Sequence, residues 1–153
     1  MKFPMNWVSV LAAASLLACG GKARGTGQSG ADPRDSLYDR LGRRDAIADV
    51  VKDFVEQRVV KDDRIKAYFA GTDLPGLEGK LVDQICEASG GPCKYTGKDM
   101  KTAHAGRNLT EADFAALVED LKASLDQFHI GAKEQSELLG ALAKMHDDIV
   151  TAK

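Results

Sequence analysis

The interpretation of this chain depends on one segment, Tyr95-Thr-Gly-Lys-Asp-Met-Lys-Thr-Ala-His-Ala-Gly-Arg-Asn-Leu-Thr110. It lies between two longer runs of apolar residues at helical spacing, and His104 stands in it four residues after Met100. A short helical turn here would direct the His104 imidazole into the space between the neighbouring helices. An imidazole in that place can be an axial ligand of haem iron. A lone histidine is more often a surface or satisfied core residue, so the rest of the chain must decide between the two interpretations.

Length and composition favour one small helical domain. The chain has 153 residues, which fits a single domain with an appended segment. Hydrophobic residues make up 44% and charged residues 29%, as in ordinary globular proteins. Only 6% of the residues are aromatic, which favours helices over a β-sandwich. The net charge is −2 with no basic stripe, so nothing indicates nucleic-acid binding.

The first 19 residues have the character of an export signal. An apolar run of twelve residues, 7–18, follows Lys2; it is too short to span a membrane, which takes ~20 residues, and it suits a signal peptide. The run ends in Leu16-Leu-Ala-Cys-Gly20, which resembles a bacterial lipoprotein cleavage box with Cys19 as the lipidated residue. Ordinary cleavage after Ala18, or a buried cysteine in a short anchor, are the alternatives. We therefore expect an exported protein of the periplasm or cell envelope, with a lipid anchor as its only membrane contact.

A glycine-rich linker is predicted at 20–35, because so much glycine cannot bury enough apolar area to offset its ordering entropy. The remaining residues, 36–153, suffice for one hydrophobic core. Apolar residues recur there at helical spacing, and Thr110 with Asp113 is close to a capping box. The predicted helices are 36–41, a helix capped by Asp45 that runs to Val59, a short turn at 65–69, 74–88, one that begins at Thr110, and 132–151.

Three polar residues leave alternatives open. Gln84 is the exception on the apolar face of 74–88, and is either a rim residue or a hydrogen-bond donor inside a pocket. Cys86 and Cys93 flank the Gly90-Gly-Pro92 stop, and are either a disulfide, which an oxidising compartment favours, or two free thiols. A zinc site made of these cysteines and His104 is disfavoured, because it would lack a nearby fourth ligand.

The order of these elements resembles that of a known family. The motifs that carry the resemblance are Ser36-Leu-Tyr-Asp-Arg-Leu-Gly42, Phe69-Ala-Gly-Thr-Asp73, Gly90-Gly-Pro92, Tyr95-Thr-Gly97, Met100-Lys101 and His104-Ala-Gly106. They resemble, in order and with close spacing, a group I truncated haemoglobin over nearly all of residues 36–153. The resemblance implies an all-α truncated globin, in which a two-over-two helical sandwich surrounds a b-type haem.

The resemblance also assigns roles to residues. It makes His104 the proximal ligand of the haem iron, and it places Phe69 against the haem face. The other residues that it places around the haem are Phe54, Leu77, Leu81, Ile85, Tyr95, Lys98 and Met100. A proximal histidine normally donates its other ring N–H to a backbone carbonyl, and we expect that here.

Two departures from the family concern the distal pocket. The family commonly has a tyrosine after the phenylalanine of the second helix, where this chain has Val55, and a glutamine where it has Leu81. The family's usual glycine pair after the first helix is here Gly42-Arg43. Both usual hydrogen-bond donors are absent, and our hypothesis is that Gln84, one turn beyond Leu81, supplies a replacement directly or through water.

The resemblance implies a haem protein that reversibly binds oxygen or another diatomic ligand, such as nitric oxide or carbon monoxide, with an unknown reductase as partner. The alternative is a redox enzyme on the same haem, a nitric oxide dioxygenase or a peroxidase-like enzyme. It ranks lower because the sequence offers no distal acid–base pair. A third possibility is a haem-free helical lipoprotein, against which the presence of both His104 and Phe69 argues.

Overall fold

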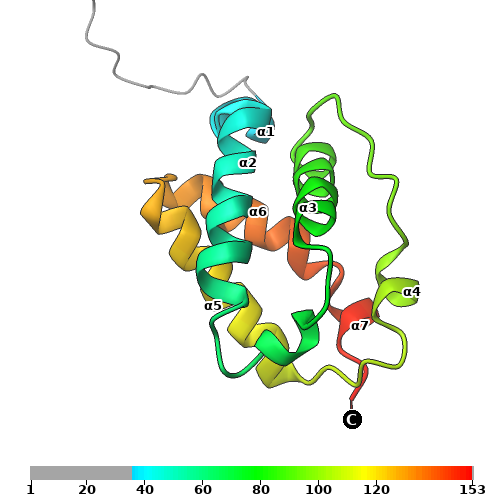
Figure 1. Cartoon of the computed structure of the whole chain (residues 1–153). Helices are drawn as coiled ribbons and strands as arrows, with labels where there is room; N and C mark the ends of the chain where they lie inside the picture. Colours follow the sequence, from blue (N-terminus) through cyan, green and yellow to red (C-terminus); the bar gives the residue numbers. More distant parts are fainter. Residues whose placement is uncertain (1–35, 153) are drawn as a thin grey trace, which may run out of the picture. The chain divides into compact units, whose positions relative to one another are not determined.

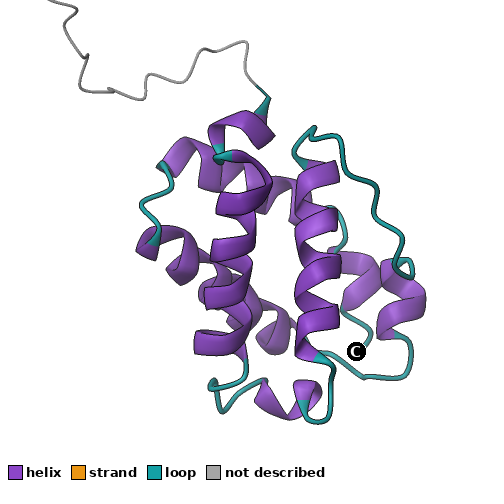
Figure 2. Cartoon of the chain, turned by 45° about the horizontal axis from the view of Figure 1, so that its top comes forward, coloured by secondary structure: helices purple, strands orange, loops and turns teal. Residues whose placement is uncertain are grey.

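The computed structural model describes residues 36–152, and in this range every regular element is helical (Figure 2). The predicted signal segment, Cys19 and the linker 20–35 lie outside the described residues. Across 36–152, no helix combines the length and the apolar character that crossing a bilayer requires. The helices are α1 (Leu37–Arg40), α2 (Arg43–Asp53), the π-helix η1 (Phe54–Val59), the 3₁₀-helix η2 (Lys66–Phe69), α3 (Leu74–Ala88), α4 (Met100–His104), α5 (Glu111–Gln127), α6 (Ala132–Ala143) and α7 (His146–Ile149).

The long helices pack as two pairs (Figure 1). The first pair is α2, continued by η1, against α3; the second is α5 against α6. The pairs meet where η1 packs on α5 and α3 on α6, while the short helices α4 and α7 pack on each other. The predicted all-helical, two-over-two arrangement is therefore confirmed.

The core lies where the two pairs meet. Its most deeply buried side chains come from α2 and η1 (Val51, Val55), α5 (Leu125) and α6 (Leu138), each at most 1% exposed. Burying an aliphatic side chain of this size contributes about 1.5–3 kcal/mol relative to leaving it in water. The apolar faces predicted from helical periodicity therefore hold the helix pairs together.

A buried polar group joins η1 to α5. The Ser124 hydroxyl, which is fully buried, donates to Oδ2 of Asp53 over 2.8 Å. Arg58 Nε lies 2.9 Å from the same carboxylate oxygen and 2.8 Å from the Ser124 hydroxyl oxygen. Asp53 and Arg58 are five residues apart, the spacing of a π-helical turn, so the wider turn of η1 suits this contact. The sequence pattern did not distinguish this π-helix from an ordinary α-helix.

Local capping groups set several helix ends. The predicted helix 74–88 is confirmed with those bounds, and Asp73 accepts a hydrogen bond from the Gly76 N–H. The capping box of Thr110 and Asp113 is also confirmed. The second helix, in contrast, begins at Arg43 behind Gly42, whose φ of +88° suits glycine, and not behind Asp45.

The prediction of one helix over 132–151 is wrong. The chain leaves the helix after Ala143 and forms the separate helix α7 from His146. Beyond α7, the N–H groups of Thr151 and Ala152 both donate to the carbonyl of Leu109 over 3.0 Å. This distant contact and the packing of α7 on α4 turn the chain away from the axis of α6, and neither is visible in the local periodicity.

A disulfide between Cys86 and Cys93 connects the end of α3 to the loop before α4, and their Cα atoms are 5.7 Å apart. Replacing both cysteines by serine should lower the free energy of unfolding by roughly 2–3 kcal/mol, because the cross-link no longer restricts the unfolded chain. Urea denaturation of the wild type and of the serine variant, each with and without a reductant, measures this change in the free energy of unfolding. The serine variant should be insensitive to reductant, and equal stability of the oxidised wild type and the variant would contradict the prediction.

Candidate functional site

The short helix α4 holds His104 in a defined orientation. Asp99 begins this helix by accepting a hydrogen bond from the Thr102 N–H over 2.9 Å. His104 is its last residue, and His104 Nδ1 lies 2.7 Å from the carbonyl oxygen of Met100, one turn earlier. Since a carbonyl oxygen only accepts, Nδ1 carries the proton, and Nε2 keeps its lone pair for a metal ion. The sequence led us to expect a backbone carbonyl as the partner of the other ring nitrogen but could not identify it. The structure identifies it as the carbonyl of Met100.

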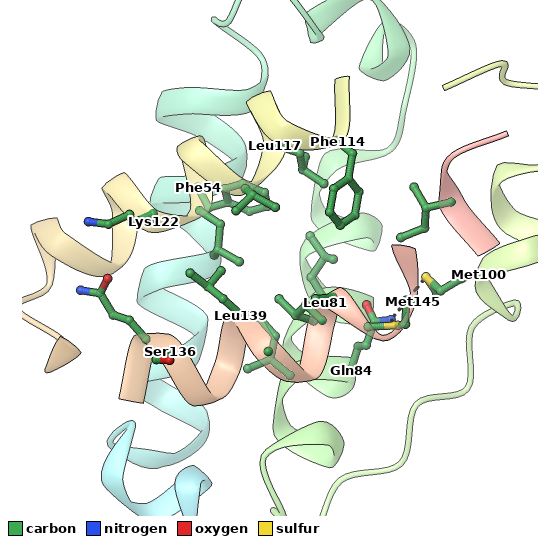
Figure 3. Close-up of a pocket in the computed structure, with 18 of the residues that line it drawn as sticks. Phe54, Leu81, Gln84, Met100, Phe114, Leu117, Lys122, Ser136, Leu139 and Met145 are labelled. Atoms are coloured by element: carbon green, nitrogen blue, oxygen red, sulfur yellow. Dashed lines mark hydrogen bonds between the residues drawn. The ribbon is translucent and has the colours of Figure 1, made fainter. Parts of the chain in front are cut away.

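Two cavities adjoin His104. The larger, of about 790 Å³, lies among α3, α5 and α6, and the smaller, of about 380 Å³, lies among η2, α3 and the segment that carries α4. The side chains of the larger cavity in Figure 3 are mostly apolar. Seven residues contribute to the walls of both cavities: Leu81, Gln84, Met100, His104, Phe114, Leu117 and Ile149. The shared walls show that the two cavities are neighbouring parts of one site.

The structure brings nearly all of the predicted site residues to these walls. The larger cavity is lined by Phe54 and Ile85, and the smaller one by Phe69, Leu77, Tyr95 and Lys98. Both cavities are lined by Leu81, Gln84, Met100 and His104. Val55 is the exception, because its side chain is fully buried in the core and lines neither cavity.

The amide of Gln84 has only weak partners. Its Nε2 lies 3.4 Å from Sδ of Met100 and 3.3 Å from Sδ of Met145, as the dashed lines in Figure 3 show. Gln84 thus connects α3 to α4 and to the start of α7. Because thioether sulfur is a poor acceptor, a stronger acceptor in the cavity would compete well for this amide.

Several lining residues were not predicted as part of the site. Four of them are apolar: Phe114 and Leu117 from α5, and Met145 and Ile149 at α7. Their helical spacing in the sequence indicated only that they are apolar positions of helices. A face that lines a cavity has the same periodicity as one that packs in the core, so periodicity alone could not have found them. The smaller cavity also has polar walls that were missed, formed by Tyr68, Thr72, Lys80, Arg107 and Asp113.

Tyr68 and Asp113 form a polar contact in the wall of the smaller cavity. The Tyr68 hydroxyl donates to Oδ2 of Asp113 over 3.1 Å, and this carboxylate raises the pKa of the phenol. The N–H and hydroxyl of Thr110 donate to the same carboxylate and keep the Asp113 pKa below its usual value. Asp113 is therefore an occupied acceptor that fixes η2 against the start of α5.

Comparisons with known proteins agree with this geometry. The bacterial-like globin family matches residues 36–151. A group 1 truncated haemoglobin from Mycolicibacterium paratuberculosis is 36% identical over 118 residues, which cover 77% of this chain and 86% of the relative. The solved truncated haemoglobin of Tetrahymena pyriformis, in its Fe(III) form, is similar with a TM-score of 0.72 and 29% identity, over 76% of this chain and 98% of that one. The 2/2 haemoglobin of Synechococcus sp. PCC 7002, in the cyanomet state and with covalently attached haem, has a TM-score of 0.71 and 25% identity, with the same coverage.

The fold, the cavity and these similarities define a globin of the two-over-two class. The chain belongs to the bacterial-like globin family and, within it, to the group 1 truncated haemoglobins, as the sequence motifs indicated. Membership of this family implies haem as the cofactor.

The residues present fit a haem. Apolar walls suit a flat macrocycle, and His104 Nδ1 is engaged with the Met100 carbonyl, so that Nε2 is the ring nitrogen available as a ligand. The exposed cations Lys80, Lys98 and Arg107 line the smaller cavity, where they could meet the haem carboxylates. The structure thus provides a ligand, an apolar container and compensating charge.

His146 holds α7 beside this site. Its Nδ1 lies 2.9 Å from Oδ1 of Asp147, and its Nε2 lies 2.8 Å from Oε2 of Glu111 on α5. Its ring also meets Phe114 edge to face, with centroids 4.9 Å apart. The hydrogen bonds to Asp147 and Glu111 raise the pKa of His146 above 6.5.

Replacing His146 by glutamine should therefore lower the melting temperature more at about pH 5.5 than at about pH 8.5. A raised pKa in the folded state stabilises the fold fully below the unfolded pKa, and this contribution is lost as the pH rises through the folded pKa. Melting curves of variant and wild type at each pH measure the difference. The variant Glu111→Gln/Asp147→Asn, which removes both acceptors, is the control and should abolish the excess stability at low pH. Equal losses at both pH values would contradict the assignment.

Proposed function

We propose that this protein reversibly binds oxygen or another small diatomic ligand at a haem iron held by His104. The observation that carries the proposal is the hydrogen bond between His104 Nδ1 and the Met100 carbonyl, because it leaves Nε2 as a metal ligand beside an apolar cavity. Leu77 and Leu81 on α3 offer no atom that would ligate iron strongly. These two side chains would therefore leave room at the iron for a small ligand.

The haem, when bound, supplies an iron that takes up a diatomic ligand reversibly. The protein's own residues do the rest. His104 holds the metal, and the Met100 carbonyl fixes the tautomer and the plane of its ring. Phe54, Leu81 and Ile85 give the larger cavity an apolar wall. An apolar wall favours uncharged diatomic ligands over anions.

Replacing His104 by glycine tests this proposal. In the reduced full-length protein supplied with haem, the variant should lose the visible spectrum of a histidine-ligated, five-coordinate iron, because Nε2 is gone. Adding imidazole, which can occupy the vacated space as a free ligand, should restore the spectrum and the sharp Soret shift on carbon monoxide addition. His129→Gly, at an exposed position outside both cavities, is the matched control and should behave as the wild type. An unchanged spectrum of His104→Gly would refute the assignment.

We further propose that Gln84 donates a hydrogen bond to the ligand, directly or through water. Its amide reaches both cavities and gives up only weak thioether acceptors to do so. Replacing Gln84 by leucine should speed oxygen dissociation roughly ten- to hundredfold, the equivalent of a lost hydrogen bond of about 1–3 kcal/mol.

Stopped-flow displacement of oxygen by carbon monoxide measures this rate. Met145→Leu is the control, since it removes a thioether acceptor but leaves the Gln84 amide in place, and it should change the rate much less. If Gln84→Leu releases oxygen at the rate of the wild type, Gln84 is not the donor.

A further inference from the structure

The segment that carries α4 is basic within an acidic chain. Residues 92–107 contain four cations, Lys94, Lys98, Lys101 and Arg107, and one carboxylate, Asp99, which gives the segment a net charge of +3. The whole chain has a net charge of −2, so the rest of it carries −5. The segment that contains His104 is therefore net positive, whereas the rest of the chain is net negative.

Four of the cations near the smaller cavity form what we call the basic rim: Lys80, Lys98, Lys101 and Arg107. Lys80, Lys98 and Arg107 line the smaller cavity, and Lys101 lies on α4 next to Met100; all four are exposed. Three of the four thus line the smaller cavity, and the fourth follows a lining residue in the chain.

Within the described residues, the cations of the basic rim have no ion-pair partner. Among the ion pairs of residues 36–152, none includes a cation of the rim, although Arg40, Arg44 and Arg64 elsewhere all pair with carboxylates. Arg107 makes one polar contact, from Nη1 to the carbonyl oxygen of Tyr68 over 3.0 Å.

The nearby carboxylates are already engaged. Asp99 accepts from the Thr102 N–H, and Asp113 accepts from Thr110 and Tyr68. The two carboxylates of a haem could neutralise at most two of the four cations. A net positive surface would therefore remain exposed at the site after haem binding.

We propose that the basic rim docks an acidic electron-transfer protein that reduces the ferric iron of this globin. The proposal rests on the proposed function, because reversible oxygen binding needs ferrous iron. In this transfer the reduced cofactor of the partner would lose one electron, and the bound haem iron would gain it and pass from Fe(III) to Fe(II). Complementary charge would align the partner over the mouth of the smaller cavity and raise the rate of productive encounter.

The test uses the full-length ferric holoprotein and, as a probe, an acidic flavodoxin in its hydroquinone form, which becomes the semiquinone by losing one electron. Stopped-flow absorbance gives the second-order rate constant of reduction. Raising the ionic strength from a few millimolar to about 0.15 M should slow the wild-type reaction about tenfold or more, because salt screens the steering charges.

The informative variant is Lys98→Glu/Lys101→Glu. Its rate of reduction is compared with that of the wild type after its carbon monoxide spectrum has shown full haem loading. It should react about tenfold more slowly at low salt. The matched control is Lys52→Glu/Lys133→Glu, which makes the same charge change at exposed positions on α2 and α6, and its rate should stay within about twofold of the wild type. The single variant Lys101→Glu, outside both cavities, repeats the test if the double variant loads poorly.

A second readout needs no electron transfer. Titration calorimetry with oxidised flavodoxin should detect a complex with the wild type and the control variant, and a much weaker one with the rim variant. Equal rates and equal binding for the rim and control variants would overturn the proposal. So would rim-dependent binding to phosphatidylglycerol vesicles without any effect on flavodoxin, since the rim would then contact a membrane.

The two proposals fail in different ways. A protein that takes up haem through His104, but is reduced independently of salt and of rim charge, loses only the docking surface. A protein whose His104→Gly variant keeps the wild-type haem spectrum loses the proposed iron ligand, whatever flavodoxin does.

Discussion

The hydrogen bond from His104 Nδ1 to the carbonyl of Met100 determines what the cavity can hold. It forms only because both groups lie on one turn of α4, and α4 begins where Asp99 captures the Thr102 N–H. In the neutral imidazole, a proton on Nδ1 leaves Nε2 as an acceptor or as a possible metal ligand. A helix of five residues thus fixes the orientation of the imidazole, as the proposed role of His104 as iron ligand requires.

The short helix is in turn held by long-range contacts. Helix α3 reaches it through the Gln84 amide, and the Cys86–Cys93 disulfide limits the loop between them. Helix α7 also packs on α4, and the chain end beyond α7 bonds to the Leu109 carbonyl. The two helix pairs form most of the walls of the larger cavity, while these weaker connections position His104 beside it. We expect this peripheral region to be the part of the fold that responds most to haem.

Arginines away from the cavity and the cations of the basic rim differ in their partners. Away from the cavity, arginines and carboxylates pair within the chain, as Arg40 does with Glu134 and Glu137, and so contribute to the fold. At the basic rim the cations stay unpaired among the described residues, although carboxylates with other duties lie close by. Charge left without internal partners is available for a ligand or another protein.

The sequence by itself determined what depends on neighbours a few residues away: the helix 74–88 with its stop at glycine, and the capping box at Thr110. The motifs around His104 also identified the family before any coordinates. Only the tertiary structure decided that Val55 faces the core, that Phe114 and Ile149 line the site, and that the last helix divides before His146. The physical reason is that caps and turns act within one helical turn, whereas an apolar stripe has the same period whether it meets another helix, a cavity or a distant carbonyl.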